Sequence, residues 1–300
     1  MAKLRIQQIT SLDLPELAPY RTMRRPAAHE LERIFVAEGV KVVTRLLESD
    51  FPVLSVLFPQ SWLAEYEPMI LRRPENEITV YVAAEKEMVE NLTGYSLFQG
   101  VLAVGGIPPS VSLEKILAAS PRPRLLVAID ALANAENIGA LVRNCVAFGV
   151  QGLIIGETSS SPFLRRSVRN SMGTIFQLPV LDLRKTEIIE TSKGKKEFSR
   201  SGKQLIPPPT LADTLRTLSG QGIRCLAAHP HANGKTISQA DFTGDCCVVF
   251  GSEGTGITEE VLKACDEAVF IPMPLTVDSL NVGGAAAVFL YEAARQRGLC

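Results

Sequence analysis

The sequence has no apolar run that is both long enough and free enough of charge to span a bilayer. Its first residues, MAKLRIQQ, contain no apolar signal core. We therefore expect a cytoplasmic chain with no membrane partner. Of its 300 residues, 46% are hydrophobic and 21% are charged, which suits one large or two ordinary globular domains with packed cores.

Cysteine pairs spaced for metal binding are also absent. The six cysteines form no C-x-x-C pair, and most of them lie in apolar runs. Zinc sites and disulfide frameworks are therefore weak interpretations, and buried reduced thiols are the better one. We expect no metal site. The cysteines are Cys145, Cys225, Cys246, Cys247, Cys265 and Cys300.

An excess of positive charge is missing as well. The formal net charge is −1, which counts mildly against a nucleic-acid binder, because such proteins are often basic overall. Local patches can replace an overall excess in enzymes that act on nucleic acids. Three basic clusters are present: Arg21, Arg24 and Arg25 with Tyr20; Arg165, Arg166 and Arg169; and Lys193, Lys195, Lys196, Arg200 and Lys203.

The pattern of apolar residues predicts two domains. Residues 1–118 resemble a small α/β unit, with short buried strands at 53–58 and 78–82. Residues 35–47 (FVAEGVKVVTRLL) indicate a strand end, a glycine turn and an amphipathic helix. The glycines and prolines of residues 105–109 punctuate this part, and residues 120–124 (SPRPR) are typical of a linker. We place a second domain at residues 122–300.

The second domain alternates strands with helices. Apolar runs predict strands near 125–129, 153–155, 224–228, 247–250 and 268–271, and helices over 137–148, 211–218, 258–265 and 280–297. This alternation favours a mostly parallel sheet with helices on both faces. In such sheets ligands bind beyond the carboxyl ends of the strands. Residues 193–209 are polar, basic and proline-rich, and predict a long loop.

A glycine-rich segment, FGSEGTGI at 250–257, follows a predicted strand and precedes a predicted helix. Its glycines let the backbone turn sharply and approach a ligand. The spacing fits neither the dinucleotide nor the P-loop pattern. An ordinary strand-to-helix turn and a ligand loop remain equally good interpretations of the residues alone. Glu253 would repel a phosphate, which favours a ligand with donors or positive charge.

Two further segments carry polar side chains at helix starts. Asn134 or Asn137 can cap the helix predicted after it, and Arg143 lies close enough along that helix to reach back over its first turn. Ser279 is a fitting cap for the last helix, whose residues 283–287 are very small. Taken singly, a plain cap, a solvated arginine and a tightly packed helix are the better interpretations.

Together, the three segments resemble the motifs of the SpoU (TrmH) family of RNA methyltransferases. The first motif, N-x-G-x-x-x-R after a strand that ends in aspartate, is similar to Asn137–Arg143 after Asp130. GSEGTGI at 251–257 resembles the second motif, and IPM at 271–273 with SLNV at 279–282 resembles the third. The resemblance covers about residues 122–300. RIFVAEG at 33–39 is similar, less specifically, to that family's RNA substrate-binding domain.

The resemblance implies a fold, a reaction and a partner. It implies an α/β catalytic domain with a C-terminal deep trefoil knot, an exception to the rule against knotted chains, beside a small N-terminal α/β substrate-binding domain. It implies a homodimer that transfers methyl groups from S-adenosylmethionine to a ribose 2′-hydroxyl of ribosomal or transfer RNA. The residues implied as catalytic are Asn137, Arg143, Glu253, Ser279 and Asn281, and those implied as cofactor-binding are Gly251, Ile271 and Leu280.

The roles follow from the chemistry. Because an arginine has a pKa of about 12 or higher, Arg143 is better suited to stabilise developing alkoxide charge than to act as a free base. Arg165, Arg166 and Arg169 follow the first motif closely enough to reach the rim of the active site, so we favour them as RNA-binding, together with Arg24 and Arg25. A solvated surface is the better interpretation of the cluster at 193–203.

The chain departs from the family pattern at two places. Residues 283 and 284 are glycines where the family often has a serine and a branched residue, and Ala135-Glu136 replaces a frequent proline. Neither change removes a proposed catalytic side chain. Three alternatives stay open: an inactive RNA-binding protein of the same fold, a knotted methyltransferase that acts on a base, and an enzyme of small nucleotides.

Overall fold

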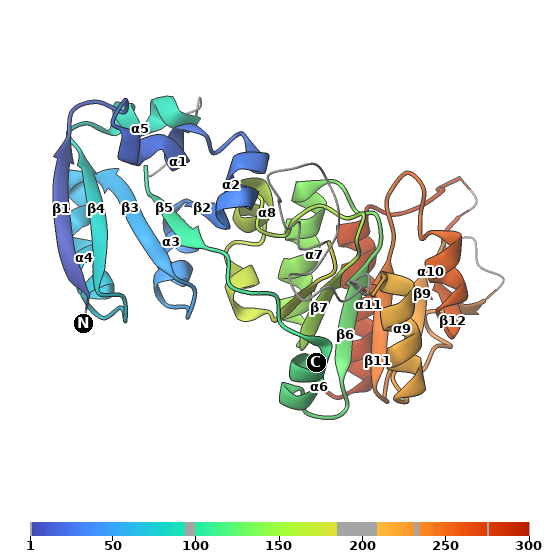
Figure 1. The fold of residues 1–300 in the computed structure, drawn as a ribbon. Helices are drawn as coiled ribbons and strands as arrows, with labels where there is room; N and C mark the ends of the chain where they lie inside the picture. Colours follow the sequence, from blue (N-terminus) through green and yellow to red (C-terminus); the bar gives the residue numbers. More distant parts are fainter. Residues whose placement is uncertain (1, 94–99, 185–208, 231–233, 275, 300) are drawn as a thin grey trace, which may run out of the picture. The chain divides into compact units, whose positions relative to one another are not determined.

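The computed structural model describes residues 2–93, 100–184, 209–230, 234–274 and 276–299. The chain divides into two compact units (Figure 1). Unit 1 comprises residues 1–109, 134–146 and 161–178, and unit 2 comprises residues 110–133, 147–160 and 179–300. Among the described residues, no helix is both long and apolar enough to cross a membrane.

Unit 1 is built on a five-stranded sheet in the order β1-β4-β3-β5-β2. The first three strands of this order are parallel, and β5 runs antiparallel to both β3 and β2. Three of these strands agree with the prediction, namely β3, β4 and β2, whose end was predicted from Phe35 onward, and β1 and β5 were missed. The strands are β1 (Lys3–Ile9), β2 (Ile34–Glu38), β3 (Val53–Pro59), β4 (Glu77–Ala83) and β5 (Leu102–Gly106).

Gly105 and Gly106 do not interrupt the regular structure of the chain, because they are the last two residues of β5. Both glycines lie in the strand and pair with β2. A Cβ added to Gly105 would stand 2.4 Å from the ring of Phe35. Glycine in this strand therefore makes room for an aromatic side chain, and the prediction of a turn was wrong.

Short helices surround this sheet. Tyr20 is fully buried in the core of unit 1 and bonds to Ser55 at 2.8 Å, so it is a core residue and not part of an exposed basic cluster. The helices of unit 1 are α1 (Ala18–Arg21), α2 (Pro26–Glu32), α3 (Val40–Leu47), α4 (Leu63–Leu71), α5 (Lys86–Thr93), α8 (Arg165–Asn170) and nearly all of α7 (Ala135–Ala147). Single 3-10 turns lie at Pro15–Leu17, Gln60–Trp62 and Thr174–Gln177.

Unit 2 contains a parallel seven-stranded sheet, as predicted, in the order β10-β12-β9-β11-β6-β7-β8. Its central strands are continuous apolar runs because both faces are covered. Strand β11 lies between β9 and β6, which places the glycine-rich segment after it in the middle of the sheet. The strands are β6 (Leu125–Ile129), β7 (Gly152–Ile155), β8 (Val180–Asp182), β9 (Arg224–Ala228), β10 (Lys235–Thr236), β11 (Cys246–Phe250) and β12 (Glu267–Phe270).

Helices cover both faces of this sheet (Figure 1). On one face, α6 (Leu113–Ala119), α9 (Leu211–Gly220) and α10 (Glu259–Lys263) share a buried apolar cluster with alternate strand residues such as Ala128 and Val249. On the other face lies α11 (Val282–Gln296), whose Phe289 meets Phe250 edge to face at 5.7 Å. Each strand therefore sends alternate side chains into two separate cores.

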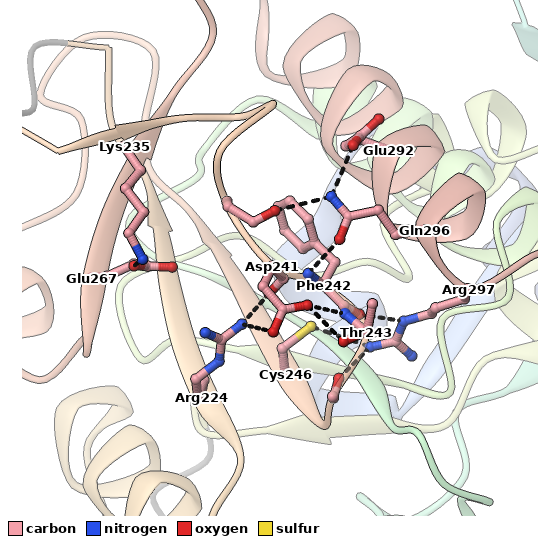
Figure 2. Close-up of polar contacts among 12 residues, drawn as sticks. Arg224, Lys235, Asp241, Phe242, Thr243, Cys246, Glu267, Glu292, Gln296 and Arg297 are labelled. Carbon is pink, nitrogen blue, oxygen red and sulfur yellow. Dashed lines mark hydrogen bonds and ion pairs between the residues drawn. The ribbon is translucent and has the colours of Figure 1, made fainter.

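The carboxyl end of α11 is fastened to two neighbouring segments (Figure 2). The guanidinium of Arg297 donates to the carbonyl oxygens of Phe242, Gly244, Arg124 and Pro123 at 2.7–2.9 Å. Gln296 accepts from Phe242 N and donates to Ala240 O. The end of one helix thus supplies hydrogen-bond donors to carbonyl groups of two segments that lie more than 50 and more than 170 residues earlier in the chain.

The compact units do not follow the predicted boundary at residues 118–122. Helix α6 packs into the core of unit 2, and residues 134–146 and 161–178 belong to unit 1. The predicted boundary was placed at a linker, which assumes that the chain passes from one unit to the other only once. Here each unit is made of three separate segments of the chain. The predicted loop at 193–209 and its basic residues lie almost wholly outside the described residues.

Candidate functional site

A pocket of about 380 Å³ opens in unit 2 at the carboxyl ends of three parallel strands. The segments that follow β9, β11 and β12 supply most of its wall, and the first turns of α11 supply the rest. This is where an α/β sheet is expected to hold a ligand. It is lined by residues 228–230, 250–256, 269–271, 273, 278–280, 282, 285 and 289.

The glycine-rich segment after β11 doubles back on itself at the pocket wall. Ser252 N donates to Gly256 O at 3.0 Å, and Gly256 N donates to Ser252 O at 2.9 Å. Gly256 has a φ of +69°, which favours glycine. A Cβ on Gly251 would stand 2.2 Å from the carbonyl carbon of Gly256, so the two arms of the turn approach too closely for any side chain there.

Asp130 ties this turn to the neighbouring strand. It follows β6, is 4% exposed, and donates its N–H to Phe250 O at 2.8 Å. Its carboxylate accepts from the backbone N–H of Thr258 at 2.7 Å, just before α10. The aspartate at the end of the strand is therefore a structural residue that fixes both ends of the glycine turn.

A side-chain hydrogen bond joins the glycine turn to the last helix. The amide of Asn281 donates to Oε1 of Glu253 at 2.6 Å, and its oxygen accepts from Gly283 N at 2.9 Å. Asn281 is thus the N-cap of α11. The prediction that Ser279 caps this helix was wrong, because the helix begins at Val282 and leaves Ser279 in the preceding segment.

The pocket gathers residues from the second and third sequence motifs. Gly251, Ile271 and Leu280, predicted as cofactor-binding, all line it. Glu253 and Ser279, predicted as catalytic, line it too, and Asn281 contacts Glu253. Their roles stay predictions, but residues from separate parts of the sequence do meet at one cavity.

The first motif lies on α7, in unit 1. The side chain of Asn134 accepts from the N–H groups of Glu136 and Asn137 at 2.8 and 3.3 Å, so Asn134 and not Asn137 caps the helix. Asn137 is 9% exposed, and Arg143 is exposed. The approach of both residues to the pocket stays a prediction.

The arginines of α8 have a partner that the sequence pattern did not indicate. Arg165 forms an ion pair with Glu38 of β2, and Arg169 approaches the other carboxylate oxygen at 3.0 Å. The side chain of Arg165 is only 10% exposed, whereas Arg166 is exposed. Arg24 and Arg25 are exposed as well. RNA binding by these five residues stays a prediction, and Arg165 has an additional structural contact.

Three pocket residues outside the predicted motifs were missed from the sequence. His229 and Pro230 follow β9, and Asp278 precedes α11. The rule that ligands bind beyond the carboxyl ends of parallel strands would have indicated His229, since its strand was predicted correctly. No comparable signal marks Asp278.

None of the five described cysteines lines the pocket. Cys145, Cys225, Cys246 and Cys247 are buried, which agrees with the prediction. Burial raises the pKa of Cys265 to about 12 and raises the pKa of Cys145 further, so neither is a thiolate at neutral pH. The described residues contain no cluster of three or more potential metal ligands.

The fold and the pocket define an α/β protein with a cavity beyond the carboxyl ends of its parallel strands, where Asn281 at the start of α11 contacts Glu253 of the glycine turn. A profile of the SpoU rRNA Methylase family matches residues 124–205 and 182–291, which together span more than half of the chain. The chain belongs to this family. The expected family is confirmed, and membership supports an RNA methyltransferase.

Relatives and solved structures agree with this assignment. An uncharacterized tRNA/rRNA methyltransferase of Mycobacterium tuberculosis is 29% identical over 97% of this chain and 93% of its own. One of Mycobacterium leprae is 30% identical over 89% and 72%. The SpoU methyltransferase AviRb from Streptomyces viridochromogenes, in complex with AdoMet, superposes with a TM-score of 0.74 at 23% identity, over 94% of this chain and 98% of that one.

Proposed function

We propose that the chain transfers a methyl group from S-adenosylmethionine to a ribose 2′-hydroxyl of ribosomal or transfer RNA. The observation that carries this proposal is the pocket, because it brings the second and third motifs together at the carboxyl ends of β9, β11 and β12. Family membership supports methyl transfer to RNA. The choice of the ribose rests on the first motif, with Arg143, which is typical of the ribose-modifying branch of the fold.

The pocket suits S-adenosylmethionine by its size and lining. Its volume of about 380 Å³ lies in the range of sites for ligands of this kind. The backbone is close-packed at Gly251, so the turn brings peptide groups to the pocket wall, and these groups can form hydrogen bonds with a nucleoside. Gly251, Ile271 and Leu280 would hold the adenosine part. The cofactor, when bound, supplies a methyl group already activated on a sulfonium.

The chain's own residues have to position the ribose and stabilise charge. The guanidinium of Arg143 keeps its positive charge at neutral pH and is suited to stabilise an oxygen that loses its proton. Glu253 is held by Asn281 and is placed to orient a donor at the pocket. Asn137 would fix the segment before its helix. Orientation of the reacting groups accounts for much of such a rate enhancement.

We also propose the family's trefoil knot and a homodimer. Two apolar side chains of α11 support the dimer, because Val288 is 39% exposed and Tyr291 is 50% exposed. Large exposed apolar groups on one helix are typical of an interaction surface. Light scattering after size exclusion tests this proposal: a mass near twice 32.5 kDa supports a dimer, and a mass of a single chain contradicts it.

Transfer of labelled methyl groups tests the reaction. The purified chain is incubated with labelled S-adenosylmethionine and unmodified ribosomal or transfer RNA, and the products are identified by nucleoside mass spectrometry. A 2′-O-methyl nucleoside supports the proposal and identifies the RNA class. A methylated base would overturn the ribose assignment. Absence of both cofactor binding and label would favour the inactive RNA-binding alternative.

A further inference from the structure

Glu38, at the end of β2, is a buried carboxylate with two arginine partners. It is 2% exposed, and a carboxylate so far from water is costly unless it is paired. Arg165 and Arg169 of α8 provide the pairing, one at each carboxylate oxygen. The partners come from a segment about 130 residues further along the chain, so this ion pair joins the N-terminal sheet to α8.

The segment around α8 has other contacts with the same part of unit 1. Arg45 of α3 donates to Met172 O at 2.6 Å. The rings of Phe163 and Phe176, on either side of α8, lie 5.2–6.0 Å from those of Phe35 and Phe51. Charge, hydrogen bonding and aromatic packing therefore all hold residues 161–178 against β2 and α3.

Helix α8 is in turn closely packed against the helix of the first motif. A Cβ added to Gly139 of α7 would stand 2.5 Å from Ser167 O and 2.6 Å from the Cβ of Asn170. Backbone is the nearest obstacle, so α7 and α8 can approach this closely only with glycine at that position. Gly139 lies between Asn137 and Arg143, the two first-motif residues proposed to act on the substrate.

We propose that Glu38 is a positioning residue that sets the place of Arg143. It holds α8 against the N-terminal sheet, and the glycine contact between α8 and α7 carries that placement to the helix on which Arg143 lies. An RNA bound by the N-terminal sheet and its helices then has a fixed position relative to the guanidinium of Arg143. The inference deepens the proposed function and rests on it for the role of Arg143.

A purely stabilising ion pair would give a different result from a positioning one. Loss of stability lowers the melting temperature but leaves the rate per folded molecule unchanged. Displacement of Arg143 lowers the rate, leaves cofactor affinity unchanged, and has no effect once Arg143 itself has been removed. A double-mutant cycle between positions 38 and 143 separates the two cases.

The experiment measures the rate of methyl transfer in a single turnover with labelled cofactor. This rate can be measured even for variants that react slowly. For Glu38→Gln we expect a rate roughly 10- to 100-fold below that of the unmodified chain, since misplacement of a catalytic group by about 1 Å costs this much. The dissociation constant for S-adenosylmethionine should stay within about threefold. Gly139→Ala disturbs the contact between α7 and α8 and should likewise lower the rate without changing the dissociation constant for S-adenosylmethionine. Glu85→Gln, at an exposed glutamate of unit 1, is the control.

The decisive result is the double variant. If Glu38 acts through Arg143, then Glu38→Gln should lower the rate no further in the Arg143→Ala background. A full additional loss there, or a normal rate for both Glu38→Gln and Gly139→Ala, overturns the inference while leaving the proposed function intact. A normal rate for Arg143→Ala removes the proposed role of that arginine and the inference with it. Absence of methyl transfer by the unmodified chain contradicts the proposed function itself.

Discussion

Gly251 shows how a single residue can shape the pocket proposed for the cofactor. The turn that it opens is closed by two hydrogen bonds between Ser252 and Gly256. No side chain fits at position 251, because its Cβ would overlap the backbone of Gly256. The requirement is one of close approach rather than of an unusual dihedral angle.

Gly251→Ala should therefore disrupt cofactor binding. We expect the dissociation constant for S-adenosylmethionine to rise at least about tenfold, because the two arms of the turn must separate and the pocket wall moves with them. Isothermal titration calorimetry measures the change. Gly220→Ala is a matched control, since a Cβ at that position meets nothing within 4 Å. Equal affinity in both variants would show that the turn is not part of the cofactor site.

Helix α11 is held at both ends by side chains. Asn281 caps its start and contacts Glu253, and Arg297 fastens its end to segments beside β6 and β11 (Figure 2). Its first turns line the pocket. The contacts that hold the ends of the helix therefore also hold in place the turns that line the pocket.

Loss of Arg297 should destabilise the fold. Its guanidinium donates to four carbonyl groups, so Arg297→Ala leaves several of them without this donor. We expect a loss of about 2–4 kcal/mol in the free energy of unfolding, measured by urea titration. Arg295→Ala removes the ion pair of an exposed arginine with Glu292 and should cost much less, because solvent screens such a pair. Similar losses for the two variants would contradict the importance of the carbonyl contacts.

The same helix should contribute a pH-dependent term to stability. Hydrogen bonds from Arg295 and Gln296 lower the pKa of Glu292 from 4.5 to about 2. Because the pKa is depressed in the folded chain, this stabilisation is complete above pH 4.5 and is lost as the pH falls toward 2. Glu292→Gln should thus lower the melting temperature at pH 7, and the difference from the unmodified chain should narrow below pH 4.5. A difference that is constant with pH would mean that charge plays no part.

At this scale the sequence predicted the elements that local patterns specify. Strands β6 and β11 are continuous apolar runs, and their positions were predicted to within a residue. Strand β5 was missed because its glycines suggested a turn, and only the ring of Phe35 across the sheet explains them. The pairing of Glu38 with Arg165 was also beyond prediction, because nothing in either segment indicates a partner 127 residues away.

At the scale of the whole molecule, 31 lysines and arginines stand against 32 acidic residues, so binding of RNA depends on local groups of basic residues. The net charge is −1, yet Arg24 and Arg25 are exposed together near the start of α2. If they bind phosphates of the RNA, each contributes to the salt dependence of binding, because a neutralised phosphate releases counterions.

Replacing Arg24 and Arg25 together by alanine should reduce that dependence. We expect the slope of log affinity against log salt concentration to fall by roughly 1 to 2. Fluorescence anisotropy with labelled RNA at several salt concentrations measures it. Arg72→Ala removes an exposed arginine outside the three basic clusters and should leave the slope unchanged. An unaltered slope in the double variant would exclude these two arginines from the RNA interface.

The repeated crossing of the chain between units bears on how the protein is made. The ribosome delivers residues in order, and domains generally fold as units during synthesis, from the N-terminus onward. Unit 1 is incomplete until residue 178 has emerged, well after the first strands of unit 2. Until then the ion pairs of Glu38 with Arg165 and Arg169 cannot form. The N-terminal sheet therefore gains this ion pair only after the first strands of unit 2 have been synthesised, so the two units complete their folding together rather than in succession.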